Sequence, residues 1–209
     1  MLSARDILLL QDQQTRDWHQ PDANAKLPLE DLDEKAGWLS AVARQHRANF
    51  ELWHIEDEAR TPGATDREIS DVKRRIDRTN QRRNDLAEEL DRLLWVWLEP
   101  QGLPRPDAPL NSESPGLIID RLSILSLKIY HTREEAERRD APAGHGERNR
   151  ERLKILEEQR SDLAGCLNDL WSATVAGTRR FKIYRQLKMY NDPALNPAIY
   201  QSAVQEKLK

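Results

Sequence analysis

The stretch DREISDVKRRIDRTNQRRNDLAEELDRLLWVWLE, residues 66–99, decides the fold of this chain. Its apolar positions recur at alternating steps of three and four, which is the spacing of a helix that packs along one seam of a bundle. Thr65 and Glu68 match a capping box before it, and Pro100 follows it, so we expect one uninterrupted helix. The seam runs through Ile69, Val72, Ile76, Thr79, Arg83, Leu86, Leu90, Leu93 and Trp97.

The composition extends this helical pattern to the whole chain. Of 209 residues, 33% are charged and 38% belong to the hydrophobic class, whereas only 8 are glycine and 2 are phenylalanine. This mixture is typical of long amphipathic helices rather than of sheets. We therefore predict an all-α fold, an antiparallel bundle of about five long helices in a single domain over residues 1–209.

Caps, glycines and prolines give the bounds of the other helices. Ser3 is a plausible N-cap for the first helix, and Ser114 with Pro115 opens the fourth. The last long helix either runs unbroken to about residue 190 or bends at Gly177, and a short helix is expected from about Pro197. The predicted ranges are 3–19, 29–60, 115–139 and 147–190.

The fourth helix differs from the others because it is apolar on two faces. GLIIDRLSILSLKIY, residues 116–130, carries one apolar row through Leu122 and a nearly opposite one through Leu117, Ile124 and Leu127. A helix of this kind is expected at the centre of a bundle. Asp120 and His131 share its second face, so each needs a polar partner if that face is covered.

The second helix carries the densest group of polar and aromatic residues. In HRANFELWHIEDEAR, residues 46–60, helical geometry places His54 on the flank of the seam stripe. The stripe itself continues through His46, Asn49, Phe50, Trp53 and Asp57.

Two interpretations of this stretch remain open. In the first, its polar groups belong to buried structural networks, satisfied by backbone, by water, or by Arg83 or Arg160. In the second, a catalytic set converges on one pocket as acid–base groups or as ligands of a divalent metal. The sequence signal for a metal site is weak. A di-iron site in a helical bundle would need a second Glu-x-x-His motif, but Lys128 stands where the acid before His131 would be. The expected catalytic set is His46, His54, Asp57, Asp120 and His131.

A basic segment near the C-terminus is the second candidate. GTRRFKIYRQLKMYNDPALNP, residues 177–197, contains five cations interleaved with aromatic rings before its first acid. Such a segment could hold a phosphate group while a ring stacks on a base or sugar, or it could be a solvated helix end. The ligand-binding residues expected from these features are Asn49, Trp53, Arg121, Lys128, Lys182, Arg185 and Lys188.

Charge and missing motifs exclude several classes of function. The net charge of −3 predicts no general attraction to nucleic acid or to an anionic membrane. A single cysteine, Cys166, excludes an intramolecular disulfide, and no stretch is apolar enough for a signal peptide or a membrane span. No phosphate-binding glycine loop and no nucleophile elbow is present. We therefore expect a cytoplasmic protein.

Three blocks together carry a family resemblance. They are residues 46–60, NSESPGLIIDRLSILSLKIYH at 111–131 and KMYNDPALNP at 188–197. With them the chain resembles, over nearly its full length, DUF4254, an uncharacterised bacterial family. The resemblance implies a small bacterial all-helical protein and brings no activity, cofactor or catalytic residue with it.

From the residues themselves we predict a small-ligand pocket or an enzyme. Its expected partner is a phosphorylated compound, which in one form of the prediction contains a sugar. We expect this compound to bind near the His and Asp cluster. The alternative is a non-catalytic helical protein that mediates interactions and self-associates as a homo-oligomer.

Overall fold

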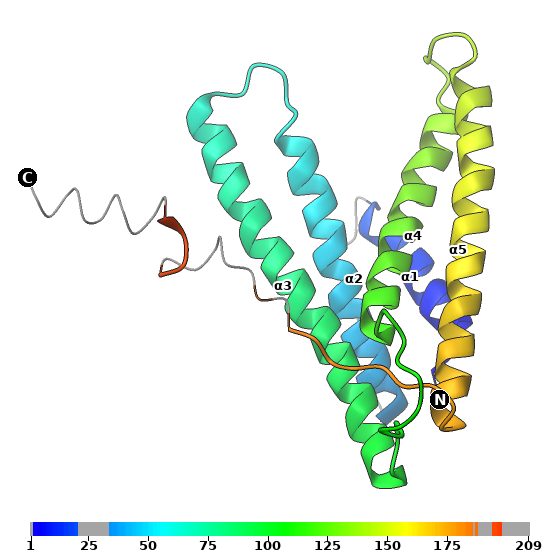
Figure 1. The fold of residues 1–209 in the computed structure, drawn as a ribbon. Helices are drawn as coiled ribbons and strands as arrows, with labels where there is room; N and C mark the ends of the chain where they lie inside the picture. Colours follow the sequence, from blue (N-terminus) through cyan, green and yellow to red (C-terminus); the bar gives the residue numbers. More distant parts are fainter. Residues whose placement is uncertain (1, 21–33, 186, 188–193, 198–209) are drawn as a thin grey trace, which may run out of the picture.

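Five long helices form the computed structural model, which describes residues 2–20, 34–185, 187 and 194–197 (Figure 1). A short 3-10 helix, η1 (Glu99–Gln101), follows the third of them. The described part of the chain contains no strand, only an isolated bridge between Leu110 and Arg180. The all-α prediction is confirmed. The helices are α1 (Ala4–Trp18), α2 (Glu34–Glu58), α3 (Asp66–Leu98), α4 (Pro115–Glu137) and α5 (His145–Val175).

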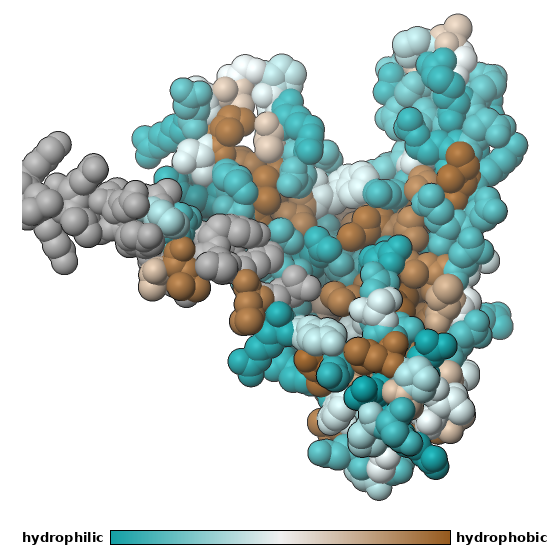
Figure 2. Space-filling view, viewed as in Figure 1, coloured by the Kyte–Doolittle hydropathy of each residue, from teal (hydrophilic) through white to brown (hydrophobic). Residues whose placement is uncertain are grey.

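The helices are arranged as two antiparallel hairpins that diverge. Figure 1 shows α2 with α3 as one arm and α4 with α5 as the other, with α1 behind them. The arms pack together around the start of α4 and separate toward their connecting loops, which join residue 58 to 66 and residue 137 to 145. Figure 2 shows the surface hollowed between the two arms. We call this hollow the notch.

Helix α4 lies at the centre, as predicted, because it contacts each of the other four long helices. Ile119, Leu122 and Leu127 are almost completely buried there, together with Leu90 of α3 and Leu167 of α5. The prediction that α4 is covered on both apolar faces is only partly met. Leu117 and Ile124 of the second row are half-buried, whereas Leu127 of the same row is buried, and Ile124 lines a groove between α4 and α5.

The first turn of α4 packs very closely against α3. A Cβ atom on Gly116 would lie 2.2 Å from the backbone oxygen of Ala87, so only glycine fits at this crossing. The carboxylate of Asp91 accepts a hydrogen bond of 2.7 Å from the Gly116 N–H, at the positive end of the α4 dipole. Burial raises the pKa of Asp91 to about 6, against the effect of this bond. The contact fixes the relative position of the two arms.

The last long helix ends earlier than the sequence predicts. α5 stops at Val175, and Gly177 adopts a left-handed φ of 71° that favours glycine. The chain then runs extended, and Phe181 is buried against Trp95 of α3. The predicted continuation to residue 190 is wrong over 176–185.

The predicted caps of the first and third helices are present. The Ser3 side chain accepts from Asp6 N, and Thr65 forms the full capping box with Glu68. The second helix ends at Glu58, two residues before its predicted end. Its predicted first residues, 29–33, and most of the predicted C-terminal helix lie outside the described residues.

Candidate functional site

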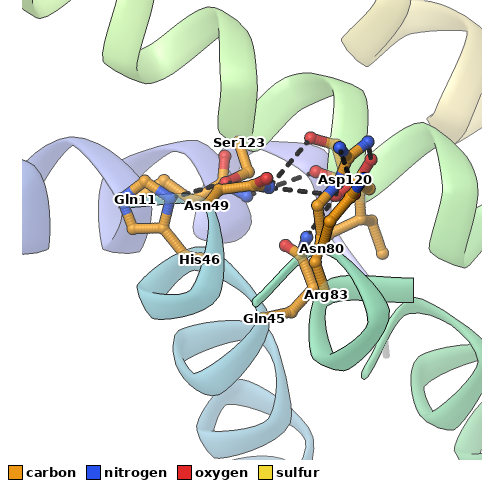
Figure 3. A network of polar contacts seen from close by, with 9 residues as sticks. Gln11, Gln45, His46, Asn49, Asn80, Arg83, Asp120 and Ser123 are labelled. Carbon is orange, nitrogen blue, oxygen red and sulfur yellow. Dashed lines mark hydrogen bonds and ion pairs between the residues drawn. The ribbon is translucent and has the colours of Figure 1, made fainter. Parts of the chain in front are cut away.

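A buried polar network joins α1, α2, α3 and α4 (Figure 3). His46 is fully buried at its centre. Its Nδ1 is 2.7 Å from Ser123 Oγ of α4, and its Nε2 is 2.9 Å from Thr15 Oγ of α1. Burial lowers the pKa of His46 to about 3, so the ring is neutral at physiological pH.

Asp120 is the acidic member of this network. Its two oxygens accept a forked pair of hydrogen bonds from Arg83 of α3, at 2.8 and 2.6 Å. The amide groups of Gln45 and Asn49 donate to the same carboxylate at 2.5 and 3.0 Å. This hydrogen bonding to Asp120 raises the pKa of Arg83. The network therefore resembles the buried structural alternative, with Arg83 as the expected partner of Asp120, although Gln45 Oε1 is buried without a hydrogen-bond partner among the described residues.

Three other histidines meet where the arms begin to separate. His19 follows the end of α1, His54 lies one turn before the end of α2, and His131 lies in the second half of α4. Each ring can present a nitrogen within 4.8 Å of a nitrogen of the other two. We call these three residues the histidine centre.

The Nδ1 nitrogen of each ring in the histidine centre is already engaged. The Nδ1–H of His19 donates to the Thr15 backbone oxygen at 2.6 Å, and that of His54 donates to the Phe50 oxygen at 2.9 Å. The Nδ1–H of His131 donates to the Glu134 carboxylate at 2.9 Å. Because these acceptors hold a proton on Nδ1, each neutral ring keeps its free lone pair on Nε2.

The Nε2 nitrogens are the unusual feature. The Nε2 atoms of His19 and His131 are buried and have no hydrogen-bond partner among the described residues. Five other buried side-chain atoms of the described residues also have no partner, so the two nitrogens point to an ion only together with the convergence of the three rings. Burial, followed by the neighbouring histidines, lowers the pKa of His131 against the effect of Glu134. A neutral imidazole is the form that binds a metal.

Aromatic rings hold the histidine centre in place. Trp53 stacks on His131 with 4.8 Å between ring centroids, and Tyr130 stacks on His19 at 4.3 Å. Phe50 contacts the rings of both His19 and His54. Rings fixed by packing and by Nδ1 hydrogen bonds need little reorganisation to bind an ion.

The structure divides the predicted catalytic residues between two places. His46 and Asp120 lie in the buried network, whereas His54 and His131 lie in the histidine centre. Asp57 belongs to neither place and is exposed. The five expected catalytic residues therefore do not share one pocket. Of the expected ligand-binding residues, Asn49 lies in the network and Trp53 stacks on His131.

His19 is the member of the histidine centre that sequence reasoning missed. It follows the last turn of α1, directly before residues 21–33, and no spacing motif links it to the other histidines. Its proximity to His54 and His131 depends on how α1 packs against α2 and α4. The only sequence signal was that it is one of 5 histidines in the chain.

The predicted ligand-binding cations also separate into two groups. Arg121 and Lys128 line one groove of about 800 Å³ between α4 and α5. Lys182 and Arg185 are exposed on the segment after α5, which pairs with the loop before α4, away from the histidine centre. Lys188 lies outside the described residues.

Comparison with known proteins identifies a family but no function. The model of a family described as "Protein of unknown function (DUF4254)" matches residues 39–183. No curated protein and no solved structure matches the chain. Among the described residues, no helix is long and apolar enough to cross a membrane.

Proposed function

We propose a function for this chain, which belongs to the DUF4254 family of proteins of unknown function, from the geometry of its histidine centre. The chain binds one divalent transition metal ion, zinc in the first instance, through His19, His54 and His131. The ion acts on a small phosphorylated compound. The observation that carries this proposal is the convergence of three imidazoles with their Nδ1 atoms occupied and two Nε2 atoms buried without partners.

The donor set selects the class of metal. Neutral imidazole nitrogens suit zinc, copper, nickel and iron, whereas magnesium and calcium prefer oxygen ligands. Zinc bonds of about 2.0–2.1 Å bring tetrahedral nitrogens to roughly 3.4 Å from one another. The 4.8 Å limit therefore requires the rings to approach by no more than about 1.5 Å. Side-chain rotations can supply this movement.

The number of ligands supports a reactive rather than a purely structural ion. Structural zinc sites are closed by four protein ligands, whereas catalytic sites use three and leave one position for water or substrate. Within the described residues the group contains three candidate ligands. An ion with an open position can polarise a carbonyl or a phosphoryl oxygen, which is compatible with a phosphorylated substrate. Lys128, three residues before His131, adds a cation nearby.

Metal binding can be tested directly on the purified protein. Metal-free protein is titrated with zinc in competition with a chromophoric chelator, and bound zinc is measured by mass spectrometry of the element. We expect one zinc per chain, with much weaker binding in His19→Ala, His54→Ala and His131→Ala. His145→Ala is the matched control, because His145 pairs with Glu135 outside the histidine centre and should leave the affinity unchanged. Unchanged affinity in all three variants would remove the proposal.

A second candidate function is self-association through α3. Leu93, Val96 and Trp97 are 40%, 66% and 43% exposed and form one stripe on the surface of α3. Acidic and basic residues alternate beside this stripe, so a second copy of the chain offers complementary charges. Light scattering after size-exclusion chromatography tests this, with Val96→Glu expected to convert a dimer to a monomer. A wild-type monomer at high concentration would exclude it.

A further inference from the structure

We propose that the groove between α4 and α5 is the substrate site beside the histidine centre. It takes a small compound that combines one phosphate group with a hydroxyl-bearing body. The inference rests on the proposed function for the reaction that follows, but its binding step does not require the metal.

The groove has the size and lining of a small-molecule site. Its volume is about 800 Å³, and the side chains that line it include the apolar residues Ile124, Leu125 and Leu163 of α4 and α5. Figure 2 shows apolar residues gathered over α4 on this face. Pockets of this size with apolar side chains and a few polar groups are typical of ligand sites. The half-burial of Ile124 on α4 therefore has a functional explanation.

Lys128 is the phosphate-binding candidate in the groove. It is exposed, and its ammonium group has no ion pair among the described residues. Arg121 is the other cation of the lining, but Glu113 accepts a hydrogen bond of 2.7 Å from it. A flexible ammonium with three donors is suited to a phosphate oxygen. The free cation therefore lies at Lys128.

The position of Lys128 links the groove to the histidine centre. Residues three apart on a helix are neighbours on its surface, with Cβ atoms roughly 5–6 Å apart. Lys128 and His131 have this relation on α4. A phosphate held by Lys128 would thus lie about one helical turn from His131, while none of the three histidines lines the groove itself.

The acidic and amide groups of the lining restrict the ligand further. Glu113 and Asp162 balance the two cations, so the groove as a whole carries no excess positive charge. This balance disfavours a polyanion such as nucleic acid. Asp162 and Gln159 offer acceptors for hydroxyl groups, and the apolar side chains fit the carbon face of a ring. One phosphate on a polyhydroxylated body satisfies all of these groups.

Calorimetric titration of zinc-free protein tests the binding step. The probes are a hexose 6-phosphate, the unphosphorylated hexose and inorganic phosphate, in a phosphate-free buffer of constant ionic strength. We expect the hexose phosphate to bind and the free hexose not to bind. Lys128→Met should weaken hexose phosphate binding at least about tenfold, the usual order for a lost charge-assisted hydrogen bond.

Two further variants separate the parts of the site. Asp162→Asn should weaken binding of the hexose phosphate and leave inorganic phosphate unaffected. Lys154→Met is the matched control, because Lys154 pairs with Glu151 on α5 and does not line the groove. Equal affinities in wild type and Lys128→Met, or no binding of the hexose phosphate to wild type, would overturn the proposal.

A last comparison connects the groove to the metal. Zinc-loaded protein should bind the hexose phosphate more tightly than zinc-free protein, and equal affinities would overturn the assignment of the groove to the histidine centre. If the three histidine variants instead leave zinc binding unchanged while Lys128→Met still abolishes hexose phosphate binding, the proposed function fails and the phosphate site remains.

Discussion

The ring of Trp53 on α2 lies parallel to the ring of His131 on α4, with 4.8 Å between their centroids and 11° between their planes. This stack joins α2 of one arm to α4 of the other. It also covers one face of a ring whose Nδ1 is held by Glu134. Trp53 therefore both connects the arms and orients a candidate metal ligand.

Replacing Trp53 tests the contribution of this stack. Trp53→Ala should lower the free energy of unfolding by about 3 kcal/mol, since it removes a large half-buried ring along with the stacking contact. Trp53→Phe keeps an aromatic ring and should lower the free energy of unfolding by a smaller amount. Urea denaturation followed by circular dichroism measures both. Equal stability of the alanine variant and wild type would show that the stack does not hold the arms.

The carboxylate behind His131 should tune metal affinity. Glu134→Gln keeps the size of the side chain but removes the charge that accepts the Nδ1–H of His131. Losing a partner of this kind typically weakens metal binding 10–100-fold. Competitive zinc titration gives the value, and Glu135→Gln, which alters a contact with Arg138 and His145, is the neighbouring control. An identical effect of both substitutions would contradict a specific role for Glu134.

Arg83 should be essential to stability because it neutralises Asp120. Asp120 is 4% exposed, and removing Arg83 leaves its charge buried. Arg83→Ala should therefore cost about 3–5 kcal/mol of unfolding free energy. The adjacent Arg82 pairs with Glu51 in solvent, so Arg82→Ala should cost under about 1 kcal/mol. Chemical denaturation of both variants makes the comparison, and similar losses would argue against a buried ion pair.

The lowered pKa of His46 predicts that the free energy of unfolding depends on pH in the acid range. Its pKa is about 3 in the folded protein and 6.5 in the reference state, so the unfolded chain takes up a proton that the folded chain excludes. The free energy of unfolding is therefore highest above pH 6.5 and falls as the pH is lowered from 6.5 to about 3. The loss is about 1.4 kcal/mol for each pH unit. His46→Gln should flatten the slope, measured by urea denaturation at several pH values. A slope equal to that of wild type would mean that another group titrates.

Much of the fold could be predicted because helical periodicity and caps are local signals. The capping box at Thr65 and the Pro115 start of α4 follow from residues within a few positions of one another. The predicted seam of α3 is only partly correct, because Leu90 is buried but Leu93 and Trp97 are exposed while Leu94 and Leu98 are buried in their place. The end of α5 could not be placed by periodicity alone. The pattern continues past Gly177, and the left-handed glycine together with the burial of Phe181 turns the chain away.

The candidate site was less predictable because it depends on how the helices pack. Asp57 lies on the inner stripe of α2 by periodicity, but it is one residue from the end of the helix and is exposed. His46, three turns earlier on the same stripe, lies where the arms pack together. His19 joins the histidine centre only through the packing of α1, which no local pattern records.

X-ray absorption at the zinc edge is the most direct measurement of the central claim. Protein loaded with one equivalent of zinc should give three imidazole nitrogens at about 2.0–2.1 Å and one further light atom from water or ligand. His145→Ala should give the same spectrum, and His54→Ala should lose one imidazole. A zinc ion with fewer than three imidazole ligands, or with a sulfur ligand, would contradict a metal centre built from His19, His54 and His131.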